Sequence, residues 1–189
     1  MKQQHKAIGI QRTTFFNGKR RIGLDTNILI KLFDNPAFFS YDESRIFNKS
    51  DVIFTHRLCF IELARYLRNK GFNEEEANKQ ANNFLNIHNI KEICHFIPEE
   101  EIRSFENKCN ERFKQMNKEQ LKCHVPDSII LLAFKKANIN KIISADESFR
   151  ECAKFLGMDS ESLPSLDYAI SRELKRIFDY KKRFHKRRR

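Results

Sequence analysis

The sequence lacks several features that mark special classes of protein. It has no tryptophan, 5 glycines and 4 prolines among 189 residues, which excludes collagen-like and low-complexity chains. Hydrophobic residues make up 40% and charged residues 32%, a balance typical of a folded domain. No run reaches the roughly 18 apolar residues of a membrane span, and no signal peptide is visible. We therefore expect a globular protein without a membrane partner, located in the cytoplasm.

The cysteines also lack the spacing of a disulfide framework or a zinc knuckle. They are odd in number, widely spaced and without a CxxC pair: Cys59, Cys94, Cys109, Cys123 and Cys152. Cys94-His95 and Cys123-His124 supply four metal-ligand side chains, but adjacent ligands fit tetrahedral zinc poorly. The expectation is buried, reduced thiols in a reducing compartment.

Basic residues outnumber acidic ones by 36 to 25, giving a formal net charge of +11. The excess lies at the two ends, because residues 1–21 hold six bases and no acid, and residues 172–189 hold ten bases and two acids. The body between them, 22–171, holds 20 bases and 23 acids. A polyanionic partner such as RNA is indicated, and the ends are where it would bind.

Short apolar runs alternate with longer helical patterns along the body. Strands are predicted at 21–24, 51–55, 93–97 and 141–144. Helices are predicted from Asn27, at 57–69, 73–88, 99–116 and 127–137, and from Ser148, where Glu151 completes capping-box spacing, to Gly157. Local patterns leave 117–125 and 159–171 undetermined.

Alternating strands and helices predict an α/β fold of three layers. Right-handed crossovers place a central, mainly parallel sheet of four to five strands between flanking helices. In such sheets ligands bind beyond the carboxyl ends of the strands. Functional side chains are therefore expected directly after each strand.

Three carboxylates occupy such positions and a fourth interrupts an apolar run. Asp25 follows the first strand, Asp127 lies in the first turn after Pro126, and Asp146 follows the fourth strand. Each also has an ordinary structural explanation, as a helix cap, a first-turn acid or a turn residue. Glu62 lies within Leu58-Cys59-Phe60-Ile61-Glu62-Leu63-Ala64, where it requires either a polar strip or a partner, for which Arg65 is a candidate.

Four carboxylates brought together would repel one another unless a cation neutralised them. Hard oxygen ligands suit Mg²⁺ or Mn²⁺. Mg²⁺ takes one or two protein carboxylates and completes its coordination with water and phosphate oxygens. This is the arrangement that phosphodiester hydrolysis requires.

In these motifs the sequence resembles the PIN-domain nucleases, among them the VapC-like ribonucleases of prokaryotic toxin–antitoxin pairs. The matching segments are Leu24-Asp25-Thr26-Asn27-Ile28-Leu29, Phe60-Ile61-Glu62-Leu63-Ala64, Pro126-Asp127-Ser128-Ile129-Ile130-Leu131-Leu132-Ala133 and Ile143-Ser144-Ala145-Asp146-Glu147-Ser148-Phe149. Together they span 22 to about 157 in the order that the family has.

The resemblance implies a Mg²⁺-dependent endoribonuclease, with Mn²⁺ as a possible substitute. It implies that Asp25 and Asp127 are metal ligands, that Glu62 and Asp146 complete the catalytic acidic cluster, and that Asn27 and Ser144 support the site. A homodimer and an antitoxin protein are the partners that it suggests. A toxin and an RNA-processing nuclease would match equally well.

The domain organisation predicted is a basic extension at 1–19, a nuclease domain at 20–160 and a helix with a basic tail at 161–189. In the tail, bases alternate with aromatics, a pattern that suits RNA binding; the residues proposed for this contact are Lys181, Lys182, Arg183, Lys186 and Arg187. A helix that packs Ile177 and Phe178 on the body is the alternative. For the whole protein, the rival function is a catalytically silent RNA-binding or ribosomal-RNA assembly protein that uses its basic tails.

Overall fold

The chain folds into a three-layer α/β structure around a parallel sheet of five strands. The structure, a computed structural model, describes residues 19–36 and 47–163. The strands are β1 (Arg21–Leu24), β2 (Val52–His56), β3 (Ile90–Ile93), β4 (Lys141–Ile143) and β5 (Asp159–Glu161). They lie in the order β3-β2-β1-β4-β5, and every neighbouring pair is parallel. The predicted fold class is confirmed.

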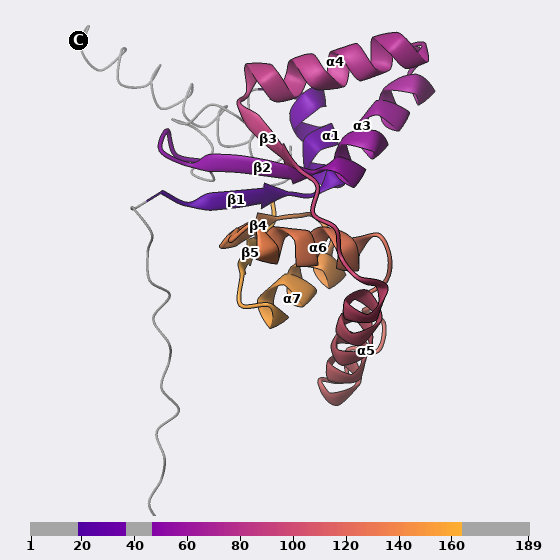
Figure 1. Cartoon of the computed structure of the whole chain (residues 1–189), viewed down its shortest axis with the longest axis vertical. Coiled ribbons are helices and arrows are strands. Elements are labelled where there is room, and N and C mark those ends of the chain that lie inside the picture. The colour runs from indigo at the N-terminus through magenta and orange to yellow at the C-terminus, as the bar shows by residue number, and fades with distance from the viewer. Residues whose placement is uncertain (1–18, 37–46, 164–189) are drawn as a thin grey trace, which may run out of the picture.

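Helices cover both faces of the sheet. They are α1 (Thr26–Asp34), α3 (Arg57–Asn69), α4 (Glu74–Ile87), α5 (Glu99–Gln115), α6 (Asp127–Lys136) and α7 (Glu147–Phe155). Figure 1 shows α1, α3 and α4 on one side of the sheet and α5, α6 and α7 on the other. The chain builds outward from β1 first through β2 and β3 and then, on the opposite side, through β4 and β5. The strand order therefore reverses between β1 and β4, where such sheets have their ligand crevice.

Sequence patterns located most elements within a residue or two, but the third strand was placed wrongly. It spans Ile90–Ile93 rather than 93–97. After α4, Asn89 adopts a left-handed φ of 51°, and Ile90, which is buried, pairs at once with Ile53 of β2. Phe96, counted in the predicted strand, is 86% exposed. An apolar run alone therefore did not mark the strand.

The fifth strand falls in a segment that the sequence left undetermined. Asp159 and Glu161 are exposed, and this three-residue edge strand has no apolar run. Its position is set by pairing with β4, in the register Ile143 to Glu161. Edge strands with charged side chains are common because the charges oppose pairing with another chain.

The described helices include none that is both long and apolar enough to cross a membrane. The basic extension 1–19 is described only at Lys19, and the segment 161–189 only as far as Leu163. The five basic tail residues predicted to contact RNA, Lys181, Lys182, Arg183, Lys186 and Arg187, lie outside the described residues.

Gly23 lies in the central strand where α6 packs closely on the sheet. A Cβ atom built there would lie 2.9 Å from Ile142 Cδ1 and 2.9 Å from Phe134 Cε2. We expect Gly23→Ala to lower the free energy of unfolding by about 1 to 3 kcal/mol, because both neighbours are fully buried and must shift. Urea unfolding measures this change. Replacing glycine by alanine restricts the unfolded chain, so a stabilised variant would show that the strand has room here.

Candidate active site

The carboxylate of Asp25 lies at the point where the strand order reverses. Its residue directly follows β1, and its backbone N–H donates to the Ile143 carbonyl of β4 at 3.2 Å. Asp25 is buried and acts as the N-cap of α1, where its Oδ1 accepts from the Thr26 N–H at 2.7 Å. The cap and the site therefore use the same side chain, so the structural and functional interpretations of Asp25 are compatible.

Asn27 and Ser144 hold the second oxygen of Asp25. The Ser144 hydroxyl donates to Asp25 Oδ2 at 2.6 Å, and the Asn27 side-chain amide donates to the same oxygen. Asn27 also accepts from the Ala145 N–H at 2.9 Å, which ties α1 to the end of β4. Both residues predicted to support the site thus contact its buried carboxylate.

The charge on Asp25 is unfavourable in this environment. Burial raises the pKa of Asp25 above its ordinary value, and the carboxylates of Asp146 and Glu62 raise it further. The hydrogen bonds from Ser144 and Thr26 lower it, because they stabilise the ionised form. A neighbouring thiol, Cys59, has its pKa raised to about 12, mainly by burial and then by the charge of Asp25. Cys59 is therefore a protonated core side chain and not a nucleophile.

Ser144→Ala is expected to raise the pKa of Asp25, because the variant removes a hydrogen-bond donor to the carboxylate. Ser144→Thr keeps the hydroxyl and is the matched control. Carbon-13 NMR titration of the aspartate carboxyl groups measures the shift directly. An Asp25 titration that is the same in the alanine and threonine variants would contradict the role assigned to Ser144.

Glu62 is held by a residue that local spacing did not identify. Arg65, three residues along α3, is exposed, and no ion pair joins it to Glu62 in the described part of the chain. The Thr26 hydroxyl at the start of α1 donates to Glu62 Oε2 instead. The sequence contained only an indirect signal, namely that a carboxylate in an apolar run needs a partner.

Asp127 is the first residue of α6, and its side chain is 23% exposed. Burial raises its pKa to about 6, and the charges of Asp25, Asp146 and Glu62 contribute in the same direction. His124 lowers the pKa, with its Nδ1 3.8 Å from Asp127 Oδ2. The sequence analysis considered His124 only as a zinc ligand and did not predict its contact with Asp127; their separation of three residues was the available signal.

Asp146 caps α7 through one of its two oxygens. Its Oδ1 accepts from the Phe149 N–H at 2.9 Å, so the cap of α7 lies two residues before the predicted cap at Ser148. The Asp146 N–H in turn donates to the Ser144 hydroxyl at 3.0 Å. Arg150 lies in α7, and its guanidinium donates to the Ser144 carbonyl at 2.8 Å. This hydrogen bond links α7 to the loop between β4 and α7.

Asp25 and Asp127 each lie within electrostatic range of the other three predicted carboxylates. Over residues 19–36 and 47–163, none of the four forms an ion pair with a lysine or arginine. No three of these carboxylates place oxygens all within 4.8 Å of each other in the same residues. The arrangement suits a hydrated divalent cation bound directly by one or two carboxylates, with the others reached through water.

The cysteines differ from the expectation in two ways. Cys94 is exposed, so the prediction that every thiol is buried was wrong there, whereas the other four are buried. Three of those four, Cys109, Cys123 and Cys152, lie together. Cys94-His95 and Cys123-His124 are not a metal cluster among the described residues.

Comparison with known proteins agrees with this geometry. The family model described as PIN domain matches residues 22–155. The structure of VapBC-1 from nontypeable Haemophilus influenzae is 17% identical, with 75% of this chain and 97% of that chain covered and a TM-score of 0.50. The structure of VapBC2 from Rickettsia felis bound to a DNA fragment from their promoter is 15% identical, with 76% and 99% covered and a TM-score of 0.53. At these identities the likeness is one of fold. A search of curated proteins gave no match.

Proposed function

Because the chain belongs to the PIN-domain family, we propose that it is a metal-dependent endoribonuclease, with Mg²⁺ as the cofactor and Mn²⁺ as a substitute. The family is generally one of nucleases. The observation that carries the proposal is the group of four carboxylates at the strand-order reversal, without lysine or arginine partners among the described residues. Burial and the neighbouring carboxylates raise the pKa values of Asp25 and Asp127, and such a site favours a divalent cation.

The donor set fits a hard cation. Asp25 and Asp127 would hold the ion directly, and Glu62 and Asp146 would hold its water ligands. When bound, the metal lowers the pKa of a coordinated water and withdraws charge from the phosphate oxygen. Its positive charge also offsets the burial and repulsion that raise the pKa values of Asp25 and Asp127.

The chain's own residues orient these carboxylates. Asn27 and Ser144 fix Asp25, and Thr26 fixes Glu62. Asp146 caps α7 through its Oδ1, whereas Oδ2 of the same side chain accepts no hydrogen bond from the described residues. We assign that oxygen as the acceptor of the proton from the attacking water. In-line attack would leave a 5′-phosphate and a 3′-hydroxyl.

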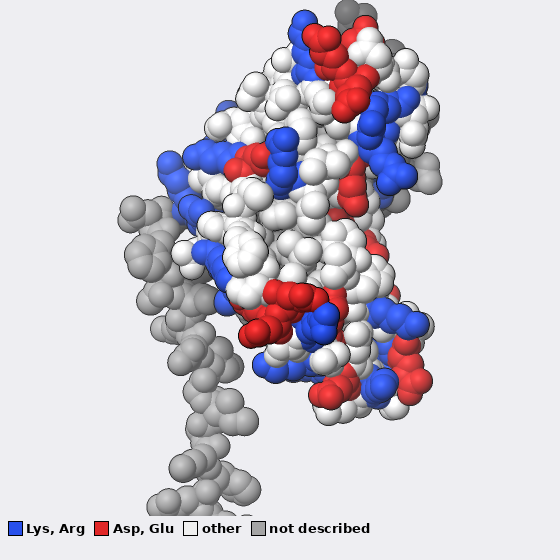
Figure 2. Space-filling view, turned by 45° about the vertical axis from the view of Figure 1, so that its right-hand side comes forward, with Lys and Arg blue, Asp and Glu red and all other residues white. Residues whose placement is uncertain are grey.

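RNA is the proposed substrate, and the basic ends supply the affinity for it. Figure 2 shows lysine and arginine interspersed with aspartate and glutamate over the face in view, without a continuous basic surface there. Lys181, Lys182, Arg183, Lys186 and Arg187 are the proposed phosphate contacts of the tail. The extensions 1–19 and 161–189 are then RNA-binding additions to the nuclease domain at 20–160.

The proposed biological setting follows the two neighbouring structures, which are VapBC toxin–antitoxin complexes. We propose that the protein acts as a toxin-like ribonuclease with a protein antitoxin, and that it forms a homodimer. An RNA-processing role is the alternative with the same chemistry. Copurification of an antitoxin-like protein encoded beside this one separates the two.

The test is incubation of the purified full chain with end-labelled RNA in Mg²⁺, Mn²⁺ or EDTA. Cleavage with either metal, lost in EDTA and giving 5′-phosphate products, is the expected result. The rival RNA-binding or ribosomal-RNA assembly function predicts salt-sensitive binding with intact RNA under all three conditions.

A further inference from the structure

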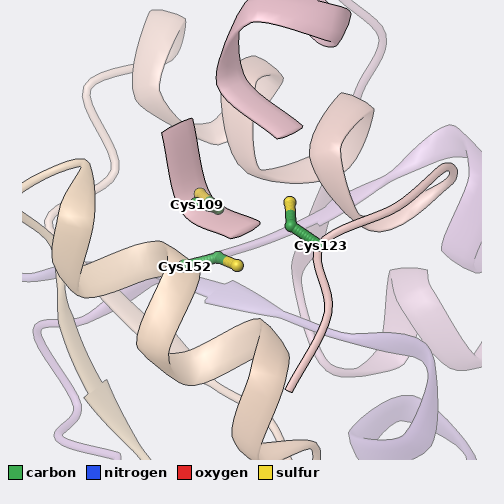
Figure 3. Close-up of side chains that lie close together, drawn as sticks. All are labelled: Cys109, Cys123 and Cys152. Atoms are coloured by element: carbon green, nitrogen blue, oxygen red, sulfur yellow. The ribbon is translucent and has the colours of Figure 1, made fainter. Parts of the chain in front are cut away.

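Three cysteines that are remote in sequence meet in one place in the fold. Cys109 lies in α5, Cys152 in α7, and Cys123 in the segment 116–126 that joins α5 to α6. Their sulfur atoms all lie within 4.8 Å of one another, and all three residues are buried. Figure 3 shows the three side chains close together on these separate segments.

The position of Cys123 is fixed by contacts that do not involve sulfur. The side-chain amide of Asn110, next to Cys109 on α5, accepts from the Cys123 N–H at 2.9 Å and donates to the Cys123 carbonyl at 3.2 Å. The neighbouring Lys122 N–H donates to the Ser148 hydroxyl of α7 at 3.4 Å. The loop is therefore docked on both helices that carry the other two cysteines. Binding a ligand here requires little ordering of the chain.

We propose that Cys109, Cys123 and Cys152 form a binding site for a thiophilic metal ion, with Zn²⁺ as the natural occupant. Zinc binds thiolate sulfur at about 2.3 Å, so two sulfurs on a tetrahedral zinc lie about 3.8 Å apart. The cluster has to contract by about 1 Å at most to reach this separation. A disulfide would use two of the three thiols and needs a sulfur–sulfur distance of about 2.05 Å.

The cysteine site and the acidic site differ in the metal ions that they prefer, because the cysteine ligands are soft sulfur atoms. Thiolates select zinc and related ions, whereas carboxylates and water suit Mg²⁺ and Mn²⁺. Three thiolates leave one position of a tetrahedral zinc for an external ligand such as water. A hollow of about 340 Å³ between α5, α6 and α7 has Cys109 in its lining, whereas Cys123 and Cys152 are not part of it.

A metal at this site would join the segments that carry two of the site acids. Cys123 precedes Asp127 by four residues, and Cys152 lies on the helix that Asp146 caps. The ion would stabilise the fold and hold these two segments against α5. It takes no part in the proposed cleavage step.

The experiment is titration of the reduced, metal-free full chain with Co²⁺ and then Zn²⁺. One equivalent of Co²⁺ should produce thiolate-to-cobalt charge-transfer bands and tetrahedral d–d bands, which one equivalent of Zn²⁺ abolishes. With free Zn²⁺ at about 100 times its Kd, Tm should rise by about 5 to 10 °C. Cys94→Ser, which changes the exposed cysteine, and Asp25→Asn, which changes the acidic site, should both retain these responses.

Cys123→Ala and Cys152→Ala should each lose the charge-transfer bands and the Zn²⁺-dependent rise in Tm. Circular dichroism of the same samples establishes that each variant is folded, and if one is not, Cys109→Ser provides the same test. Cobalt bands that survive in the folded cysteine variants would overturn the proposal. So would the absence of bands in the wild-type chain, or a stable disulfide within the cluster after mild air oxidation in the presence of equimolar Zn²⁺.

Discussion

Asp25→Asn is expected to lower metal-dependent RNA cleavage by at least about 10³-fold. A bound metal contributes several kcal/mol to stabilising the transition state, and each 1.36 kcal/mol corresponds to a factor of ten in rate. Asparagine has nearly the same shape but lacks the charge that the Ser144 hydroxyl and the Asn27 amide surround. Cleavage of end-labelled RNA in Mg²⁺ measures the loss.

The fold should survive this substitution, because asparagine is also a favourable N-cap and the variant removes a buried charge. Asp34→Asn is the matched control, since Asp34 lies on the same helix but is exposed and pairs with Lys70. The control variant should cleave RNA at a rate within about twofold of that of the wild type. Equal cleavage by both variants would remove Asp25 from the active site.

Asp127→Asn is expected to abolish cleavage and yet to stabilise the metal-free protein at pH 7.5 by about 1 to 3 kcal/mol. Burial and the neighbouring carboxylates raise the Asp127 pKa to about 6, so the folded state bears the cost of an unfavourable charge at neutral pH. The unfolded chain titrates near the ordinary value of 3.8. The destabilisation of the folded state by ionised Asp127 is therefore fully present above pH 6. It decreases as the pH falls from 6 toward 4 and is absent below that.

Urea unfolding in EDTA at pH 7.5 and pH 4 measures the effect, which should be present at the higher pH and lost at the lower. Asp51→Asn is the contrasting control, because Asp51 accepts hydrogen bonds from Arg20 at 2.9 and 2.6 Å and its loss should destabilise the protein. Saturating Mg²⁺ should stabilise the wild type more than the Asp127 variant. A destabilised Asp127→Asn at pH 7.5 would mean that the carboxylate is structural.

Sequence patterns correctly located the elements whose runs of apolar residues are also the residues that the fold buries. Strands β1, β2 and β4 are mostly buried and rich in apolar residues. The two central side chains of strand β3 are exposed, so the strand lacks an apolar run. The prediction was therefore placed on the apolar residues of 93–97 that follow it. Strand β5 contains no apolar run at all and depends on its pairing with β4.

The acidic site was predictable for a topological reason. In a parallel sheet, residues that directly follow strands meet at one edge, so Asp25 and Asp146 could be assigned from chain position alone. The contact between Thr26 and Glu62, and the meeting of three cysteines, join segments far apart in the chain. Spacing within one segment carries no information about such contacts, so they appeared only in the folded structure.

The most direct measurement is the anomalous difference density of a crystal of the full chain soaked with MnCl₂. We predict a manganese ion between the carboxylates of Asp25 and Asp127, at the end of β1 beside β4, with water ligands toward Glu62 and Asp146. Manganese absent from this crevice at saturating concentration, or bound only elsewhere, would contradict the assignment of these carboxylates as a metal-dependent active site.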